Sequence, residues 1–129
     1  EWINRLRQMG MSVISENGPV FDEARAIYNR AKIGLNWSTL DDLNCRFFEL
    51  PAFKICPVMN YVPDAQLFLE PDVDYLQFST MREAVEKAMW AKLNPDKAKE
   101  IAQRAYEKIR PHTFDNRTEM ILRECGFIL

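Results

Sequence analysis

One segment constrains the fold more than any other: an alternating run at residues 32–37 that leads, through a polar loop, into an apolar segment at residues 44–53. The alternation predicts a strand, and the segment after the loop predicts a short helix. That helix carries a lone cation, Arg46, and a lone carboxylate, Glu49. In a parallel α/β domain the carboxyl ends of strands and the starts of the next helices line the ligand crevice. The two side chains are therefore placed to bind different parts of a nucleotide, the phosphate at Arg46 and the ribose hydroxyls at Glu49. The alternative is an ion pair that caps an ordinary helix.

The rest of the chain alternates between strand and helix periodicity. We expect strands at residues 11–15, 32–37, 55–59 and 73–78, helices at 2–9, 22–31, 44–53, 64–69, 80–93, 95–110 and 113–125, and a turn at 17–19. Strands separated by helices and short loops predict an α/β fold, with a Rossmann-like parallel sheet flanked by helices. A strand would normally precede the first helix, so we expect residues 1–129 to form one domain that lacks its first strand and belongs to a longer protein.

Several residues predict how elements begin, end or pair. Asp22 is expected to cap a helix, and Thr80 with Glu83 has the spacing of a capping box. Pro51 should shorten or kink the helix that contains it. Pro57 lies in a strand and predicts that this strand is at an edge of the sheet or contains a bulge.

Composition excludes several classes of protein. With 129 residues the chain has room for one hydrophobic core, and its formal net charge of -2 gives no global field that would attract nucleic acid. Three cysteines without Cys-x-x-Cys spacing and a single histidine disfavour a disulfide framework and a metal centre, so we expect neither metal nor another cofactor. The sequence has no apolar run of about 20 residues that would span a membrane. A cytoplasmic location fits these features.

Residues 46–52, which read Arg-Phe-Phe-Glu-Leu-Pro-Ala, carry a resemblance to a known family. They resemble the Arg-x-Phe-Glu-(Ile/Leu)-Pro-Ala signature in the carboxy-terminal half of bacterial GT-B glycosyltransferases of the group-1 type, related to spore-maturation glycosyltransferases. Residues 18–20 and 27–36 are similar to other stretches of that half, and residues 112–117 to its His-Thr-(Tyr/Phe)-x-x-Arg. The resemblance covers residues 18–122 and is most specific at 46–52.

The resemblance implies a function, which is the binding of a nucleotide-sugar donor. Glu49 would accept hydrogen bonds from the ribose, and Arg46 with Asn44 would face the diphosphate. Such enzymes generally need no metal, because backbone amides and basic side chains stabilise the departing diphosphate. Acceptor recognition and the catalytic base would belong to a missing amino-terminal half, so the isolated chain is expected to be inactive. Its exposed sheet edge could also lead it to form homo-oligomers.

Two further residues are candidates for the same site. Asp41 precedes Glu49 by eight positions, which is similar to the Glu-x7-Glu spacing of retaining GT-B enzymes; the alternative is a solvated loop acid. Lys54 stands where the family usually has glycine, which would allow a positive φ and close approach of a ligand. Lysine adds a cation there, so phosphate binding would be altered. His112 is interpreted as a loop or capping residue.

Two other classes of protein compete with the transferase interpretation. One is a non-catalytic α/β module, degenerate at Lys54, that mediates protein association. The other is a receiver domain, which is disfavoured because no predicted strand ends in the acidic cluster that a phosphoacceptor site needs.

Overall fold

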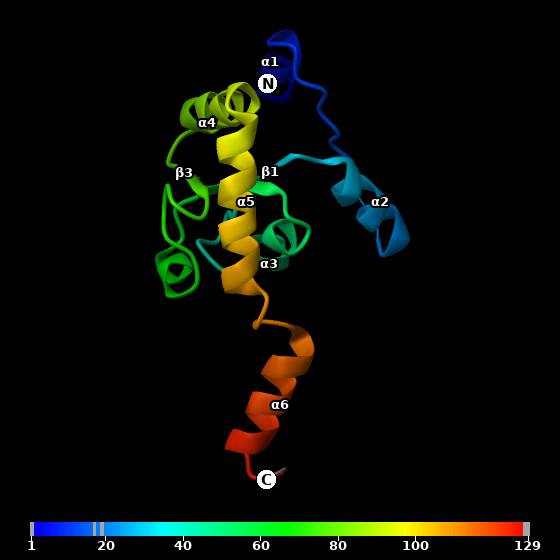
Figure 1. Ribbon diagram of the computed structural model, residues 1–129, viewed down its shortest axis with the longest axis vertical. Helices are drawn as coiled ribbons and strands as arrows, with labels where there is room; N and C mark the ends of the chain where they lie inside the picture. Colours follow the sequence, from blue (N-terminus) through cyan, green and yellow to red (C-terminus); the bar gives the residue numbers. More distant parts are fainter. Residues whose placement is uncertain (1, 17, 19, 128–129) are drawn as a thin grey trace.

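The computed structural model describes residues 2–16, 18 and 20–127 and shows a parallel sheet with helices on both faces (Figure 1). The elements are α1 (Trp2–Gln8), α2 (Asp22–Arg30), β1 (Ile33–Asn36), α3 (Cys45–Ala52), β2 (Cys56–Asn60), the 3-10 helix η1 (Pro63–Leu67), β3 (Leu76–Phe78), α4 (Met81–Leu93), α5 (Pro95–Ile109) and α6 (Phe114–Glu124). The strands lie in the order β1-β2-β3, and both pairings are parallel. The predicted Rossmann-like α/β fold is therefore confirmed. The predicted turn falls on residues 17–19, of which 17 and 19 lie outside the described residues.

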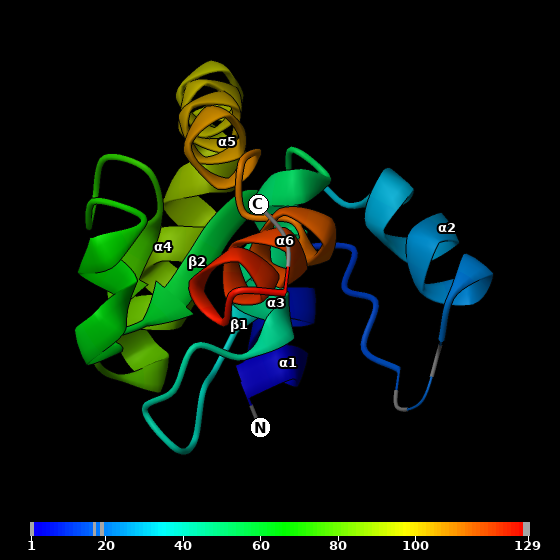
Figure 2. The same cartoon turned by 90° about the horizontal axis from the view of Figure 1, so that it is seen from below.

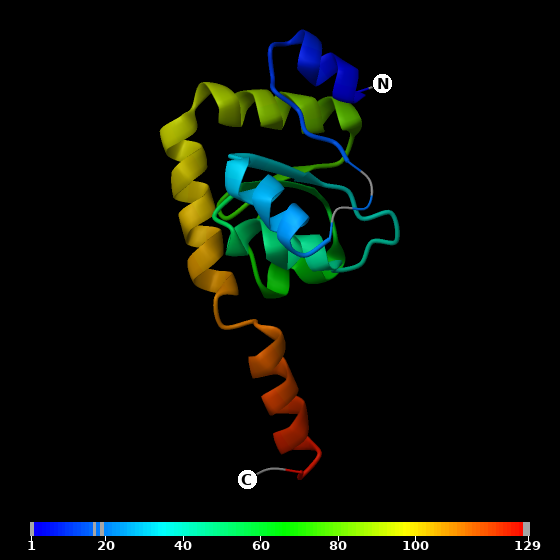
Figure 3. The same ribbon diagram turned by 90° about the vertical axis from the view of Figure 1, so that its right-hand side faces the viewer.

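Each face of the sheet has its own apolar core, as the period-two alternation of strands requires. On one face Leu35 lies opposite Val58 and Val58 opposite Leu76, and these side chains pack against α4 and the first half of α5. On the other face Met59 packs with Phe47 of α3, with η1 and with the last turns of α5. Figure 3 shows α5 running along the side of this layered body.

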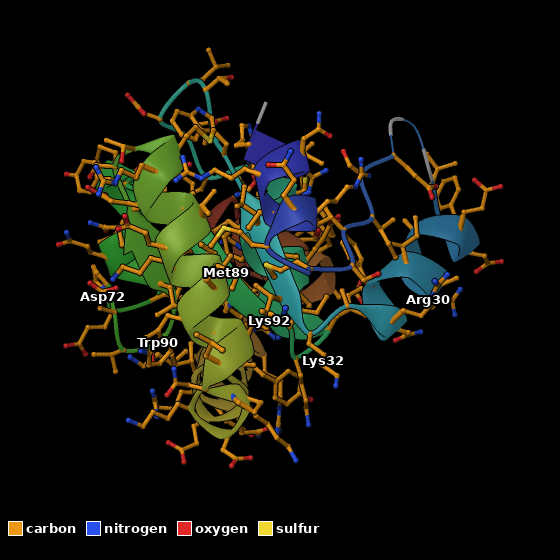
Figure 4. The ribbon with its side chains drawn as sticks, turned by 90° about the horizontal axis from the view of Figure 1, so that it is seen from above. Arg30, Lys32, Asp72, Met89, Trp90 and Lys92 are labelled. Atoms are coloured by element: carbon orange, nitrogen blue, oxygen red, sulfur yellow. The ribbon has the colours of Figure 1, made fainter. Side chains whose placement is uncertain are left out.

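α1 is followed by Gly10, which ends the helix, and it contacts α4. Gly10 has a φ of 78°, and the backbone N–H of Met11 donates to the carbonyl of Leu6 at 3.1 Å. This is the arrangement of a glycine that follows a helix C-terminus. Lys92 of α4 donates to the Gly10 carbonyl at 2.8 Å, and Figure 4 shows this lysine on the side of α4 that faces α1.

The prediction of a strand at residues 11–15 is wrong. The segment has no regular secondary structure, because none of the described residues forms a ladder with it. Its alternate apolar residues, Met11 and Val13, are only half-buried and pack beside the cluster of Leu6, Val85 and Ala88. A period-two pattern alone does not make a strand when no partner supplies hydrogen bonds.

The interpretation of Pro57 is also wrong, since β2 is the central strand of the sheet. The N–H of Cys56 donates to the carbonyl of Lys32 on the β1 side, at 3.0 Å. The nitrogen of Pro57 therefore points toward the β3 side, because successive N–H groups alternate along a strand. There the ladder begins only at Val58, opposite Leu76. Proline is accepted in this central strand because its missing N–H falls just before the pairing starts.

Three smaller predictions about element ends have mixed outcomes. Asp22 does not cap α2: it is the first residue of the helix, Phe21 holds the cap position with a φ of 49°, and the Asp22 carboxylate pairs with Arg25 instead. Pro51 does lie in a short helix, as predicted. The last strand begins at Leu76 rather than at 73, because the preceding loop turns through Asp72 at a φ of 55°.

The prediction that Thr80 and Glu83 cap the start of α4 is confirmed. The hydroxyl of Thr80 accepts from the N–H of Glu83 at 3.2 Å, and the Glu83 carboxylate accepts from the N–H of Ser79 at 2.7 Å. Pro95 occupies the first position of α5.

The three cysteines are free, and burial raises the pKa of the Cys56 thiol to about 12. Within the part of the chain that is described, no helix is both long and apolar enough to cross a membrane.

Two helices stand apart from the layered body. Every residue of α2 keeps part of its surface exposed, and Figures 1 and 2 show this helix to one side of the sheet. The least exposed side of α2, with Ala24, Ile27 and Tyr28, is only half-buried. α6 projects from the opposite end to α1, with Phe114 and Ile121 more than half exposed (Figure 1).

We expect the chain to self-associate through the free edge of β1. Among the described residues β1 pairs only with β2, and an unpaired edge is a template for another strand. Sedimentation velocity over a concentration series should show concentration-dependent dimers. The double variant Phe114→Ser/Ile121→Ser should still associate, because it alters only α6. Monomers at all concentrations, or monomers only in the α6 variant, would contradict association through the strand edge.

Candidate functional site

The start of α3 is fixed by two asparagines. Asn44 is the N-cap, and its side-chain oxygen accepts from the N–H of Phe47 at 3.2 Å. Its amide also exchanges hydrogen bonds of 3.0 and 3.3 Å with the amide of Asn36, the last residue of β1. Asn36 is buried, so this reciprocal pair ties the carboxyl end of β1 to the helix start. The backbone N–H groups at the start of α3 therefore open at the strand ends, where an anion would be favoured.

The loop between β1 and α3 is tied to the end of the central strand. Asn60, the last residue of β2, accepts from the N–H of Ser38 at 2.7 Å and donates to the Ser38 carbonyl at 2.9 Å. The Ser38 hydroxyl then donates to the Asp42 carboxylate at 2.5 Å. Polar side chains at the ends of two neighbouring strands thus set the course of the loop that leads to the site.

Arg46 and Glu49 lie one helical turn apart on the exposed face of α3. Tyr28 of α2 reaches the same place: its hydroxyl donates to Oε2 of Glu49 at 3.0 Å. The Tyr28 ring also contacts Phe53, with ring centroids 5.0 Å apart. Burial raises the pKa of the Tyr28 hydroxyl, a hydrogen bond with Arg46 lowers it, and Glu49 raises it. The balance is an elevated pKa, so the hydroxyl keeps its proton at neutral pH.

These residues line a groove of about 800 Å³ between α2 and α3. Its lining combines apolar side chains with polar and charged ones: Val20, Phe21, Ala24, Arg25, Tyr28, Asn36, Trp37, Asn44, Cys45, Arg46, Glu49 and Phe53. The groove opens at the carboxyl end of β1, where an α/β fold is expected to bind ligands. Its size and mixed lining are those of a small-molecule site.

Of the predicted site residues, the structure brings Asn44, Arg46 and Glu49 together in the groove. Asp41 lies in the preceding loop, exposed and with a φ of 51°, and is not among the residues that line the groove. Lys54 is not in the lining either, because its ammonium lies 4.5 Å from the centroid of the Tyr106 ring on α5. Its φ of 56° is the left-handed conformation that a glycine would favour at this position.

The segment after α5 makes packing and capping contacts and does not line the groove. His112 lies against Phe68 with ring centroids 4.9 Å apart, in an edge-to-face arrangement. Thr113 caps α6 by accepting from the N–H of Asn116 at 3.1 Å. Arg117 lies over the ring of Phe68, 5.3 Å from its centroid. The interpretation of His112 as a loop residue agrees with this position.

A smaller hollow, about 430 Å³, lies beside α4, where Figure 4 labels Asp72 and Trp90. Sequence reasoning overlooked that the loop before β3 contains an Asp-x-Asp pattern, at Asp72 and Asp74. Asp72 accepts from Lys87 at 2.6 Å, and the buried Asp74 accepts from Lys108 at 2.5 Å. The two carboxylates are each neutralised by a different lysine, and no cluster of three or more metal-ligating residues occurs in the described ranges.

Sequence reasoning also missed the contribution of α2 to the groove. Tyr28 lies on α2, and its helical spacing gave no sign that it would face α3, the signature helix that carries residues 46–52. Trp37, the first residue after β1, is another lining residue that the sequence did not single out. It packs against Phe78 with ring centroids 5.5 Å apart and remains partly exposed.

The fold is an α/β domain of Rossmann-like type, and the groove lies at the carboxyl end of β1. Residues 2–123 match the model of a family described as glycosyl transferase-like, and the chain belongs to this family. No curated protein and no solved structure gives a significant match.

Proposed function

We propose that this domain binds the nucleotide-sugar donor of a GT-B glycosyltransferase as its carboxy-terminal half. Membership of a glycosyl transferase-like family supports a role in sugar transfer. The observation that carries the proposal is the groove, in which a carboxylate and a guanidinium lie one turn apart beside a helix N-terminus.

In this function each group has a distinct task. Glu49 accepts hydrogen bonds from the ribose hydroxyls, while Arg46 and the backbone N–H groups at the start of α3 hold the diphosphate. Asn44 contributes by fixing that helix start. The apolar wall of the groove, including Trp37 and Phe53, covers the less polar parts of the donor. The acceptor and the catalytic base lie on another part of the full-length enzyme, so the isolated chain binds donor without turnover.

The proposal is tested by the ligand dependence of two substitutions. Arg46→Ala should weaken nucleoside diphosphate binding by about 1.5–3 kcal/mol, because it removes a charge-assisted phosphate contact. Glu49→Gln should weaken nucleoside and nucleotide binding alike. Arg46→Ala should leave the binding of the unphosphorylated nucleoside unchanged. Titrations of UDP, GDP, ADP and CDP, and of the matching nucleosides, followed by amide chemical shifts, measure both effects.

The matched control is Arg110→Ala, which removes an exposed arginine outside the groove. It should leave affinity for the nucleoside diphosphates unchanged. Shift changes should centre on Asn44, Arg46 and Glu49. If neither site substitution alters binding, or if the shifts centre on His112, the donor-site proposal is wrong and the non-catalytic module replaces it.

A further inference from the structure

Tyr28 is a specific connection between α2 and the candidate site. α2 is largely exposed, yet the Tyr28 side chain reaches α3, donates to Glu49 at 3.0 Å and packs on Phe53. Ring packing alone would hold the two helices together. The hydroxyl group adds a polar contact to the one carboxylate to which the proposed function assigns ribose recognition.

This hydroxyl is a constant donor. Burial raises the pKa of the Tyr28 hydroxyl, so this group stays protonated near neutral pH. It is therefore not an anionic partner of Arg46. A carboxylate on an exposed helix face otherwise rotates freely and loses that freedom when a ligand binds. A fixed donor on Oε2 removes part of this cost in advance.

The hydrogen bond also leaves the carboxylate able to bind a ligand. Each carboxylate oxygen has two acceptor positions. Among the described residues no donor bonds to Oε1 of Glu49, and Oε2 retains one acceptor position. Two acceptor positions at the spacing of one carboxylate match the two neighbouring hydroxyls of a ribose. Accordingly, Tyr28 directs Glu49 and does not block it.

We propose that Tyr28 is a positioning residue for recognition of a vicinal diol: its hydroxyl holds the Glu49 carboxylate in the orientation that accepts both ribose hydroxyls. The inference rests on the proposed donor site. It adds that selectivity for a ribose over a deoxyribose depends on α2 as well as on the signature helix.

The test is Tyr28→Phe, which removes the hydroxyl and keeps the ring on Phe53. The ribonucleoside diphosphate that binds most tightly among UDP, GDP, ADP and CDP should bind the variant on the order of 3–10-fold more weakly, because ligand binding must then also immobilise the Glu49 side chain. The 2′,3′-dideoxy form of the same nucleotide and inorganic pyrophosphate should bind wild-type and variant equally. Isothermal titration calorimetry measures all three ligands.

Two controls separate positioning from a purely structural role. Tyr106→Phe removes the hydroxyl of a tyrosine that lies under Lys54, outside the groove, and should change no affinity. In a Glu49→Ala background, Tyr28→Phe should cause no further loss, because the residue through which it acts is gone.

The outcomes distinguish this inference from the proposed function. If Glu49→Ala itself leaves binding unchanged, or if no nucleotide binds, the donor site is wrong and the inference falls with it. If Glu49→Ala weakens binding while Tyr28→Phe does not, only the inference is wrong. Equal losses for pyrophosphate and the ribonucleotide, or a loss that persists in the Glu49→Ala background, would show that Tyr28 merely tethers α2.

Discussion

Replacing Lys108 by methionine is expected to lower the free energy of unfolding by about 2–3 kcal/mol, because it leaves a buried carboxylate without its cation. Asp74 is fully buried, and Lys108 is its close partner, with Nζ 2.5 Å from Oδ2. Arg104 is no substitute, since its Nε lies 4.0 Å from Oδ1 and its guanidinium already donates to the Val73 carbonyl. Among the described residues Oδ1 of Asp74 has no hydrogen-bond donor. The lysine side chain is 46 % exposed, which keeps the expected loss below that for a fully buried pair.

Urea denaturation followed by circular dichroism measures this loss. Lys99→Met is the matched control, because Lys99 is an exposed lysine on the same helix, and it should change stability by less than about 0.5 kcal/mol. The double variant Asp74→Asn/Lys108→Met should be more stable than Lys108→Met alone, since the uncompensated charge is removed. A Lys108→Met variant as stable as the wild type would show that water reaches Asp74.

The sequence predicted those elements whose signals are local. The helix cap at Thr80 could be predicted because a capping residue and its N–H partner lie within one turn. The parallel sheet followed from strand and helix patterns that alternate along the chain. The burial of Asp74 could not be predicted from the sequence, because nothing near a loop carboxylate indicates that a lysine more than 30 positions later will pair with it.

The two errors about strands share one cause, which is that they depended on a partner elsewhere in the fold. Residues 11–15 have a strand pattern, but a strand also needs a neighbour. Pro57 was taken to predict an edge strand or a bulge, but the outcome depended on which side its nitrogen faces relative to β3. Propensity describes a segment in isolation, whereas pairing is a property of the whole sheet.

In the candidate site, too, local features could be predicted and contacts between distant elements could not. Arg46 and Glu49 come together because i and i+3 positions share a helix face, so their proximity was predictable. The directions of Lys54 and Tyr28 were not, because they depend on where α5 and α2 dock. The signature helix therefore supplies Arg46 and Glu49, while one wall of the groove and the hydrogen bond to Glu49 come from α2, which a local motif does not include.

The position of the signature helix depends on Gly34, and Gly34→Val is expected to cost about 3 kcal/mol of stability through overpacking. A Cβ atom at residue 34 would lie 2.4 Å from Cδ2 of Leu50 and 3.0 Å from Cγ2 of Ile55. Leu50 and Ile55 are both buried, so the Leu50 side chain has no free space into which to move. A valine otherwise suits a strand, and a larger residue in place of glycine normally stabilises a compatible site, so a loss would identify the clash as its cause.

The compensating change is Leu50→Ala, which removes about as much side chain as Gly34→Val adds. Alone it should cost about 2–5 kcal/mol, because it leaves a cavity under α3. The double variant should cost less than the sum of the two single changes by at least about 1 kcal/mol, since each relieves the defect of the other. Urea denaturation of the four proteins completes the cycle, and strictly additive losses would show that Gly34 and Leu50 do not share this space. Because Leu50 belongs to the helix that carries Arg46 and Glu49, the Gly34→Val variant should also bind nucleoside diphosphates more weakly than the double variant does.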